Sequence, residues 1–186
     1  FGYLPDQELL HDIHFTVEPG QMVAIVGPSG SGKSTIINFI PRLYDVWGGS
    51  VSIAGVDVRK YDLTYLRSQI GVVSQDTYLF NGTIRENLLY AKEDATEEEL
   101  IEACKAASIH EFIAAQPEGY DTPVGNRGLK LSGGEKQRIS IARCILKDAP
   151  VILLDEATAS VDADNEFYIQ QAVSELCRDK TVLVIA

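Results

Sequence analysis

The chain has 186 residues, of which 45% are hydrophobic, and this length and composition predict one globular domain of moderate size. Its 16 Lys and Arg residues against 27 Asp and Glu residues give a formal net charge of −11, which argues against a nucleic-acid partner because that binding is driven by clustered basic residues. No stretch approaches the length of about 18 consecutive apolar residues that a membrane span needs, so none is predicted within it.

The first segment alternates apolar and polar residues. Residues 13–17 (Ile-His-Phe-Thr-Val) predict a strand, and residues 18–21 predict a turn. A hairpin is predicted further on, with strands at 50–53 and 56–58 on either side of Ala-Gly. Together these patterns predict a small antiparallel sheet beside a parallel core.

A glycine-rich segment at residues 27–35 fits the pattern G-x-x-x-x-G-K-[ST] of a phosphate-binding loop (P-loop). Residues 22–26 predict a buried strand before it and residues 34–40 a helix after it, which is the context that the motif requires. The glycines let backbone N–H groups turn inward, and the helix adds the positive end of its dipole. The predicted nucleotide ligands are Gly27, Pro28, Ser29, Gly30, Ser31, Gly32, Lys33, Ser34 and Thr35.

Two side chains of this loop have distinct predicted roles. Lys33 supplies a full positive charge to the β- and γ-phosphates, and the hydroxyl of Ser34 is a ligand of the kind that Mg²⁺ prefers. The alternative is a flexible Gly-Ser linker that happens to precede a lysine. Five apolar residues directly before such a linker would not be expected, so the loop is interpreted as a binding site for ATP and Mg²⁺.

A further buried strand is predicted at residues 70–74, and Gln75 follows it. Its side-chain oxygen could reach the Mg²⁺ or a water molecule, although a glutamine at the end of a strand is usually just solvated. Beyond it, residues from about 84 to 147 predict a helical region. There Thr96 and the glutamates after it form a capping box that starts a helix through residue 106, and a short helix is predicted at 108–115.

A second motif, at residues 131–135 (Leu-Ser-Gly-Gly-Glu), starts another predicted helix. Ser132 and Glu135 have capping-box spacing, which by itself explains both residues structurally. Gly133 and Gly134 each cost about 1 kcal/mol in a helix, so close approach of a ligand to the backbone is the natural compensation. We predict that this helix start meets a γ-phosphate, which need not belong to the same subunit.

The last third of the chain returns to a parallel α/β pattern. Residues 151–154 form an apolar run typical of a strand covered on both faces, a helix is predicted at 164–177 and a final strand at 181–185. Asp155 follows the first of these strands, where a carboxylate could bind Mg²⁺, and Glu156 could act as general base toward the attacking water. The alternative is a chance acidic pair that caps the next helix.

The motifs, in this order, resemble the nucleotide-binding domain of an ATP-binding cassette (ABC) transporter over all 186 positions. The resemblance implies an α/β fold of the P-loop NTPase class, with a RecA-like parallel core, a small antiparallel β subdomain and an inserted helical subdomain at about 84–147. It also implies that Tyr3 stacks on adenine rather than belonging to a frayed terminus. The segments that carry it are residues 27–35, Gln75, 131–135, 155–156 and 160–162.

The resemblance implies a mechanism as well. Two such domains close head to tail around two MgATP, so that the phosphate loop of each meets residues 131–135, the signature, of the other. Lys33, Gln75 and Glu156 would be catalytic, and Ser34, Gln75 and Asp155 would bind the metal. The partners would be a second nucleotide-binding domain and transmembrane domains outside this chain, so the expected place is the cytosolic face of a membrane.

Residues 76–84, 122–128 and 155–158 resemble the exporter branch of the family. Residues 128–138 are similar to the heavy-metal-tolerance and mitochondrial half-transporters of the multidrug-resistance subfamily. Asn126 departs from the Glu usual in this exporter loop, and Glu135 from the more common Gln of the signature. The family's switch histidine follows the last strand, and the sequence given ends at Ala186. None of the three histidines replaces it by position, so we expect this segment to bind ATP but to hydrolyse it slowly.

Two other functions are compatible with parts of the sequence. A soluble, non-transport ATPase of the same cassette type would act in DNA repair, chromosome structure or translation, but the acidic charge and the exporter-like segments disfavour it. A regulatory domain that only binds nucleotide is disfavoured because the predicted catalytic and metal-binding residues are all present. The transported substrate would be selected by parts of the protein outside this chain.

Overall fold

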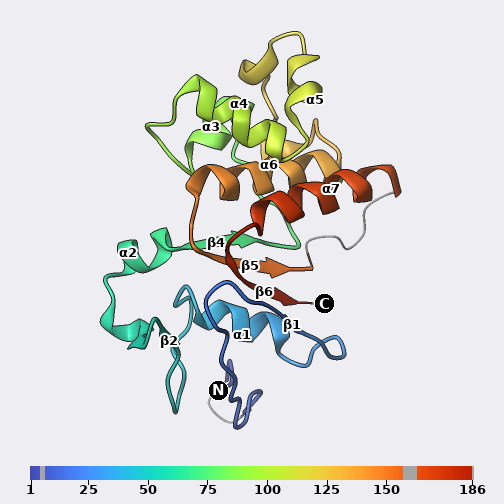
Figure 1. The fold of residues 1–186 in the computed structure, drawn as a ribbon. Coiled ribbons are helices and arrows are strands. Elements are labelled where there is room, and N and C mark those ends of the chain that lie inside the picture. The colour runs from blue at the N-terminus through green and yellow to red at the C-terminus, as the bar shows by residue number, and fades with distance from the viewer. Residues whose placement is uncertain (5–6, 157–162, 186) are drawn as a thin grey trace.

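The computed structural model describes residues 1–186 except 5–6, 157–162 and 186. Its main sheet has four parallel strands in the order β1-β6-β5-β4 (Figure 1). Their bounds are Met22–Ile25 (β1), Ile70–Val73 (β4), Val151–Asp155 (β5) and Thr181–Ile185 (β6). The predicted parallel core is therefore confirmed, and β5 lies between two other strands, as its continuous apolar sequence indicated.

The two inner strands, β5 and β6, are covered on both faces. The edge strand β1, predicted as a buried strand at residues 22–26, ends at Ile25 and is only partly covered, with Met22 59% exposed. Ile152 and Leu154 of β5 pack into a core shared with the long helices, whereas Leu153 packs into a second core shared with Ile37. Successive side chains of a strand point to opposite faces, so one apolar run contributes to two cores. This double burial fixes the register of the strands and holds their carboxyl ends in place at one edge.

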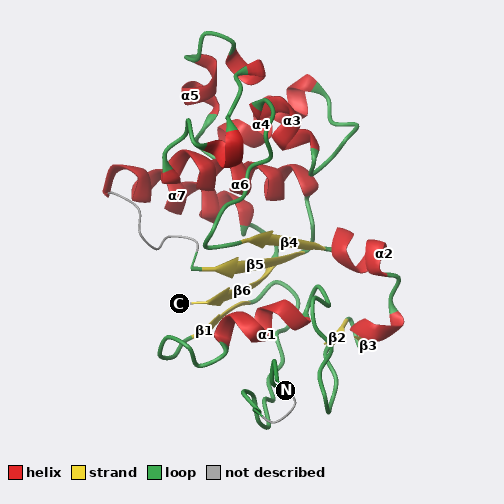
Figure 2. Ribbon diagram, turned by 180° about the vertical axis from the view of Figure 1, so that it is seen from behind, coloured by secondary structure: helices red, strands yellow, loops and turns green. Residues whose placement is uncertain are grey.

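Helices cover the two faces of the sheet unequally. On one side lies α1 (Lys33–Phe39), and on the other lie α6 (Gly133–Lys147) and α7 (Ala163–Leu176), with further helices stacked beyond them (Figures 1 and 2). Those helices are α3 (Ile84–Leu89), α4 (Glu97–Ala106) and α5 (His110–Ala114). The short helix α2 (Leu63–Ser68) precedes β4.

The helix starts follow from local side-chain chemistry. Thr96 accepts a hydrogen bond from the backbone N–H of Glu99, whose carboxylate in turn accepts from the backbone N–H of Thr96. The predicted capping box of this helix is confirmed. Ser132 and Glu135 form the same reciprocal pair at α6, and Thr83 and Glu86 form a third at α3 that the sequence analysis did not identify.

The small antiparallel sheet is shorter than predicted. It consists of β2 (Ser52–Ile53) and β3 (Val56–Asp57), followed by a 3₁₀ turn at Val58–Lys60. The prediction of a strand at residues 13–17 is wrong, because these residues have no regular secondary structure. Ile13 and Phe15 are about half exposed, and no strand in the described part of the chain pairs with them; alternation alone does not satisfy a strand's backbone hydrogen bonds.

Within the described residues, no helix is both long enough and apolar enough to cross a membrane.

Candidate functional site

The loop before α1 adopts the conformation that its glycines permit. Gly30 and Gly32 have φ angles of 78° and 91°, in the region that disfavours residues with a Cβ. A Cβ on Gly32 would also lie 2.7 Å from Leu10 Cδ2, so this glycine packs against the N-terminal segment. Gly32 is the N-cap of α1 and provides no side-chain hydrogen bond. The first turn of the helix therefore has no side-chain cap for its N–H groups.

Lys33 is held inside this loop. Its side chain is buried, and Nζ donates to the carbonyl oxygens of Gly27 at 2.7 Å and Pro28 at 3.1 Å. Both acceptors are neutral, so they orient the ammonium group without cancelling its charge. The loop thus combines a fixed positive charge with an uncapped helix start, and both features favour an anion.

Ser34 and Asp155 come together from two different elements. Ser34 Oγ, in the first turn of α1, donates to Asp155 Oδ1 at the end of β5 over 3.1 Å. A hydroxyl and a carboxylate oxygen at this separation suit a small, oxygen-preferring cation such as Mg²⁺. The described residues contain no cluster of three or more His, Cys, Asp or Glu side chains that could hold a metal alone. The donor set therefore fits a cation that takes its remaining ligands from phosphate and water.

Glu156 and Gln75 follow neighbouring strands at this edge of the sheet. Glu156 has a positive φ of 47°, and its N–H donates to Ile185 O over 3.3 Å, which extends the pairing of β5 with β6 by one hydrogen bond. A glutamate in the left-handed region is strained, but seven other non-glycine residues in the described part of the chain share this region, so the strain alone does not mark a site. Gln75 is exposed two residues after β4, whose last residue, Val73, pairs with Leu154.

Tyr3 is packed rather than frayed. Its hydroxyl lies 2.8 Å from Thr35 Oγ1, and its ring meets that of Tyr44 edge to face with centroids 5.2 Å apart. The ring is about half exposed. Tyr3 is thus attached to the helix that starts at the phosphate loop.

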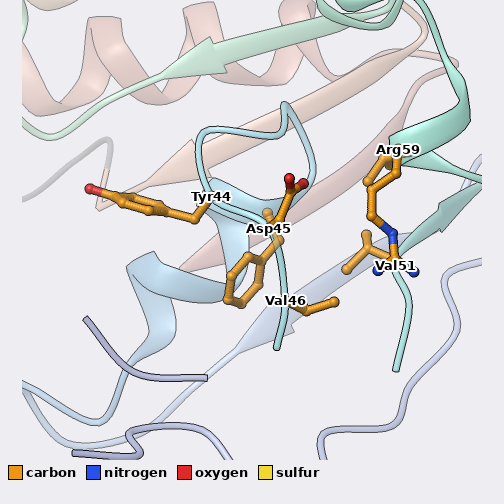
Figure 3. Close-up of a pocket in the computed structure, with 7 residues that line it drawn as sticks. Tyr44, Asp45, Val46, Val51 and Arg59 are labelled. Carbon is orange, nitrogen blue, oxygen red and sulfur yellow. The ribbon is translucent and has the colours of Figure 1, made fainter. Parts of the chain in front are cut away.

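The loop after α1 encloses only a small pocket. Tyr44, Asp45, Val46, Val51 and Arg59 lie around it (Figure 3). Its volume of about 10 Å³ suits at most a single water molecule. This pocket is therefore too small to be an adenine site. Among the described residues, three exposed aromatic rings lie near α1, those of Tyr3, Tyr44 and Trp47.

The two glycines at the start of α6 have different environments. A Cβ on Gly134 would lie 2.5 Å from Cγ of Asn165 in α7, so this residue is small because two helices approach closely. A Cβ on Gly133 would meet nothing within 4 Å. Helix packing thus accounts for Gly134 within the chain, and only Gly133 is left open toward a ligand or a partner.

The structure brings some of the predicted site residues together and separates others. Lys33, Ser34, Asp155 and Glu156 gather at one edge of the sheet, but the signature lies on α6, on the other side of the sheet from α1 (Figure 1). No hydrogen bond between described residues joins residues 27–35 to residues 131–135. The predicted loop at 160–162, and residues 157–158 of the exporter-like segment, lie outside the described residues.

Comparison with known proteins identifies the family. The model of the ABC transporter family matches residues 10–159, which is most of the chain. The chain belongs to the ABC transporter family.

Individual relatives support the exporter-type resemblance. YgaD of Bacillus subtilis, named as an export ATP-binding/permease protein, is 55% identical over 187 residues, and ATP-binding cassette sub-family B member 6 of Xenopus tropicalis is 54% identical over 186. The solved structure of a bacterial Atm1-family ABC exporter with ATP bound superimposes with a TM-score of 0.93 at 48% identity. All three matches cover 100% of this chain but only 32%, 22% and 32% of the other chain, respectively. The predicted fold class and subfamily resemblance are confirmed.

Sequence reasoning missed one residue of the signature helix. Gln137 is a buried polar residue whose amide contacts the segment around Gln75. A signal for it was present, because Gln137 lies four residues before Ile141, on the same face of a helix whose apolar residues enter the core. A polar residue at such a position is expected to have hydrogen-bond partners.

Proposed function

We propose that this ABC domain binds and hydrolyses ATP to power an exporter whose transmembrane domains lie outside this chain, at the cytosolic face of a membrane. One observation carries the proposal: the hydrogen bond between Ser34 of α1 and Asp155 of β5, next to the enclosed Lys33. This arrangement places a phosphate-binding loop and a pair of oxygen ligands at one edge of the sheet. YgaD and the Atm1-family protein are named as export proteins, so these comparisons do not favour a soluble, non-transport ATPase.

In the proposed site, Lys33 and the backbone N–H groups of residues 27–35 bind the phosphates of ATP, while Tyr3 stacks on its adenine. Ser34, Asp155 and Gln75 would hold Mg²⁺, which neutralises charge on the phosphate oxygens during transfer. The oxygen donors at 3.1 Å support this part of the proposal. The lysine acts by orientation, since its two carbonyl partners set where its charge lies before any ligand arrives.

Glu156 is proposed as the general base. Its position directly after β5 puts it one residue beyond the proposed metal ligand Asp155, at the same edge of the sheet. A carboxylate there would accept a proton from the attacking water as the bond to the γ-phosphate breaks. Gln75, from the neighbouring strand end, would help to orient that water.

The second half of each site is proposed to come from another domain. Because α6 and α1 lie on opposite sides of the sheet, one chain does not bring its own signature to its own phosphate loop. A head-to-tail pair of domains would place Ser132 and Gly133 of one against the nucleotide of the other. The open space beside Gly133 and the exposure of Ser132 support this arrangement.

We propose further that residues 1–186 on their own hydrolyse ATP slowly, because none of the three histidines matches the family's switch histidine by position. His110 lies 2.9 Å from the hydroxyl of Tyr120 in the helical region, and His11 pairs with Glu8. An extension by a few tens of native residues should raise the steady-state rate of phosphate release. Equal and brisk rates for both lengths would contradict this proposal.

Replacement of Lys33 tests the binding site directly. Lys33→Ala should weaken MgATP binding and lower turnover about a hundredfold or more, the scale associated with loss of one charge-stabilising group. Isothermal calorimetry measures the binding, and circular dichroism checks the fold. Lys60→Ala is the control, because Lys60 is exposed in the 3₁₀ turn away from the site. Unchanged affinity in a folded Lys33→Ala protein would contradict the phosphate-loop assignment.

A further inference from the structure

The segment that carries Gln75 is attached to the signature helix by one buried amide. Thr77 Oγ1 donates to Gln137 Oε1 at 2.5 Å, and Gln137 Nε2 donates over a longer distance, 3.5 Å, to the carbonyl oxygen of Ser74. The two contacts lie on either side of Gln75 in the sequence. Gln137, which is only 5% exposed, therefore holds the backbone just before Gln75 and the side chain two residues after it.

The following residues are attached to the helical side as well. Arg143 of α6 donates to Tyr78 O at 2.8 Å and to Asn87 O at 2.6 Å. Asn87, fully buried, accepts from Phe80 N at 2.8 Å and donates to Phe80 O at 3.0 Å. Residues 74–80 are thus fixed at four positions, while Gln75 itself is exposed between two of them.

The chemistry of Gln137 indicates a positioning role rather than packing alone. A buried amide is tolerated when its oxygen and nitrogen both have partners, whereas an apolar side chain would fill the same space without that requirement. Thr77 and Ser74, which this amide contacts, belong to a loop. The contact also joins two parts of the proposed mechanism, since Gln137 lies only one turn after the signature residue Gly133.

We propose that Gln137 is a positioning residue for Gln75. It couples the position of the signature helix to the position of the Gln75 side chain at the edge of the sheet where Ser34 and Asp155 lie. This proposal rests on the proposed function. When α6 shifts as its first turn meets a partner's nucleotide, the amide of Gln137 moves Ser74 and Thr77 with it. Gln75 then reaches its working position only when the signature is engaged.

The first test removes the hydrogen bonds and keeps the shape. In the full-length protein, Gln137→Met should lower kcat about ten- to hundredfold, the scale of a small misplacement of a catalytic group, with KM for ATP changed less than about twofold. The Mg²⁺ concentration that gives half-maximal activity should rise. Ile141→Val is the matched control on the same face of α6; it should lower the melting temperature without moving the Mg²⁺ dependence.

Changes at Thr77 test the same contact from the loop and do not depend on the folding of Gln137→Met. Thr77→Val has nearly the same shape but no hydroxyl, and it should reproduce the loss of kcat and the shift in Mg²⁺ dependence. Thr77→Ser keeps the hydroxyl and should retain nearly full activity. If Thr77→Val has wild-type kcat and Mg²⁺ dependence, the proposed coupling is overturned.

A double-mutant cycle decides whether Gln137 acts through Gln75. In a Gln75→Ala background, Gln137→Met should cost less than about a further twofold in kcat. The same fold loss in both backgrounds would show that Gln137 acts independently of Gln75 and would overturn the proposal. ATP hydrolysis by the wild-type protein, measured in parallel, separates the two proposals. If the wild type does not hydrolyse ATP, the proposed function is overturned. If it does, but the losses of kcat from the two substitutions are additive, only the proposed role of Gln137 is overturned.

Discussion

The two helix starts that the proposed mechanism uses, those of α1 and α6, both follow glycine-containing motifs but differ in how their first turns are completed. At α1 the N-cap is Gly32, which has a left-handed backbone and provides no side-chain cap. At α6 the N-cap is Ser132, which forms a complete capping box with Glu135. The chain therefore caps the N-terminus of the signature helix with its own side chains, whereas the first turn of α1 has no side-chain cap.

From this difference we expect the starts of α1 and α6 to have different roles. The start of α1 lies beside Lys33, Ser34 and Asp155, which are groups proposed to bind and react with ATP. The start of α6 is a preformed surface that needs no ligand in order to fold. We expect changes near α1 to affect chemistry, and changes on the exposed side of α6 to affect assembly.

The largest effect is expected from the general base. Glu156→Gln should lower kcat on the order of 10²–10⁴-fold while ATP binding is retained, because an amide does not accept the proton of the attacking water. Since the closed pair of domains would then persist, ATP should promote a dimer detectable by light scattering. Glu166→Gln is the control, as Glu166 is an exposed acidic residue of α7. Wild-type turnover together with a monomer at all ATP concentrations would contradict the assignment.

The second largest effect is expected from a substitution that blocks formation of the dimer but not the binding of ATP. Ser132→Arg should abolish the ATP-dependent dimer, because it places bulk and positive charge where the partner's nucleotide must fit, while calorimetry should still detect ATP binding to the monomer. The substitution also removes a helix cap, at a cost of about 1 kcal/mol. Thr96→Arg removes the equivalent cap of α4 and serves as the control. A similar loss of dimer in both variants would attribute the effect to helix stability instead.

A smaller effect is expected from the two adjacent glycines at the start of α6, which differ in their surroundings. Gly134→Ala should lower the free energy of unfolding by about 1–3 kcal/mol, because its Cβ would overlap Asn165 and force α6 and α7 apart. Gly133→Ala has free space and should leave stability unchanged or slightly higher, while it weakens the ATP-dependent dimer. Urea unfolding and light scattering measure the two effects. Equal stability losses would contradict the difference in environment described here.

The smallest expected effect is a change in the pH dependence of stability, and it arises in the helical region that packs against α6. Burial raises the pKa of the Cys104 thiol from 9.0 to about 12. The unfolded chain therefore loses this proton at lower pH than the folded chain, and the stabilisation, fully present below pH 9, is lost as pH rises toward 12. Urea titrations between pH 8 and 10 should show a decline of at most about 1 kcal/mol per pH unit from this group. The decline should be shallower in Cys104→Ala than in wild type; identical slopes in the two proteins would contradict this.

Local chemistry was sufficient to predict a large part of this domain. The phosphate loop, the capping boxes at Thr96 and Ser132, and the buried strands at 151–154 and 181–185 follow from short-range patterns of backbone freedom, capping and hydrophobicity. The family resemblance, now confirmed, came from the order of these motifs along the chain. These features can be predicted from the sequence because each depends on neighbours within about ten residues.

Only the tertiary structure decided the features that depend on distant partners. The alternating residues 13–17 have the pattern of a strand but pair with no strand among the described residues, since a pattern does not supply hydrogen-bond partners. Gly134 is small because of Asn165, 31 positions away, and the amide of Gln137 reaches Thr77, at a separation of 60 residues. Such contacts arise from how helices and loops pack across the sheet. Packing brings together residues that are distant in the sequence, and the identity of one does not predict the other.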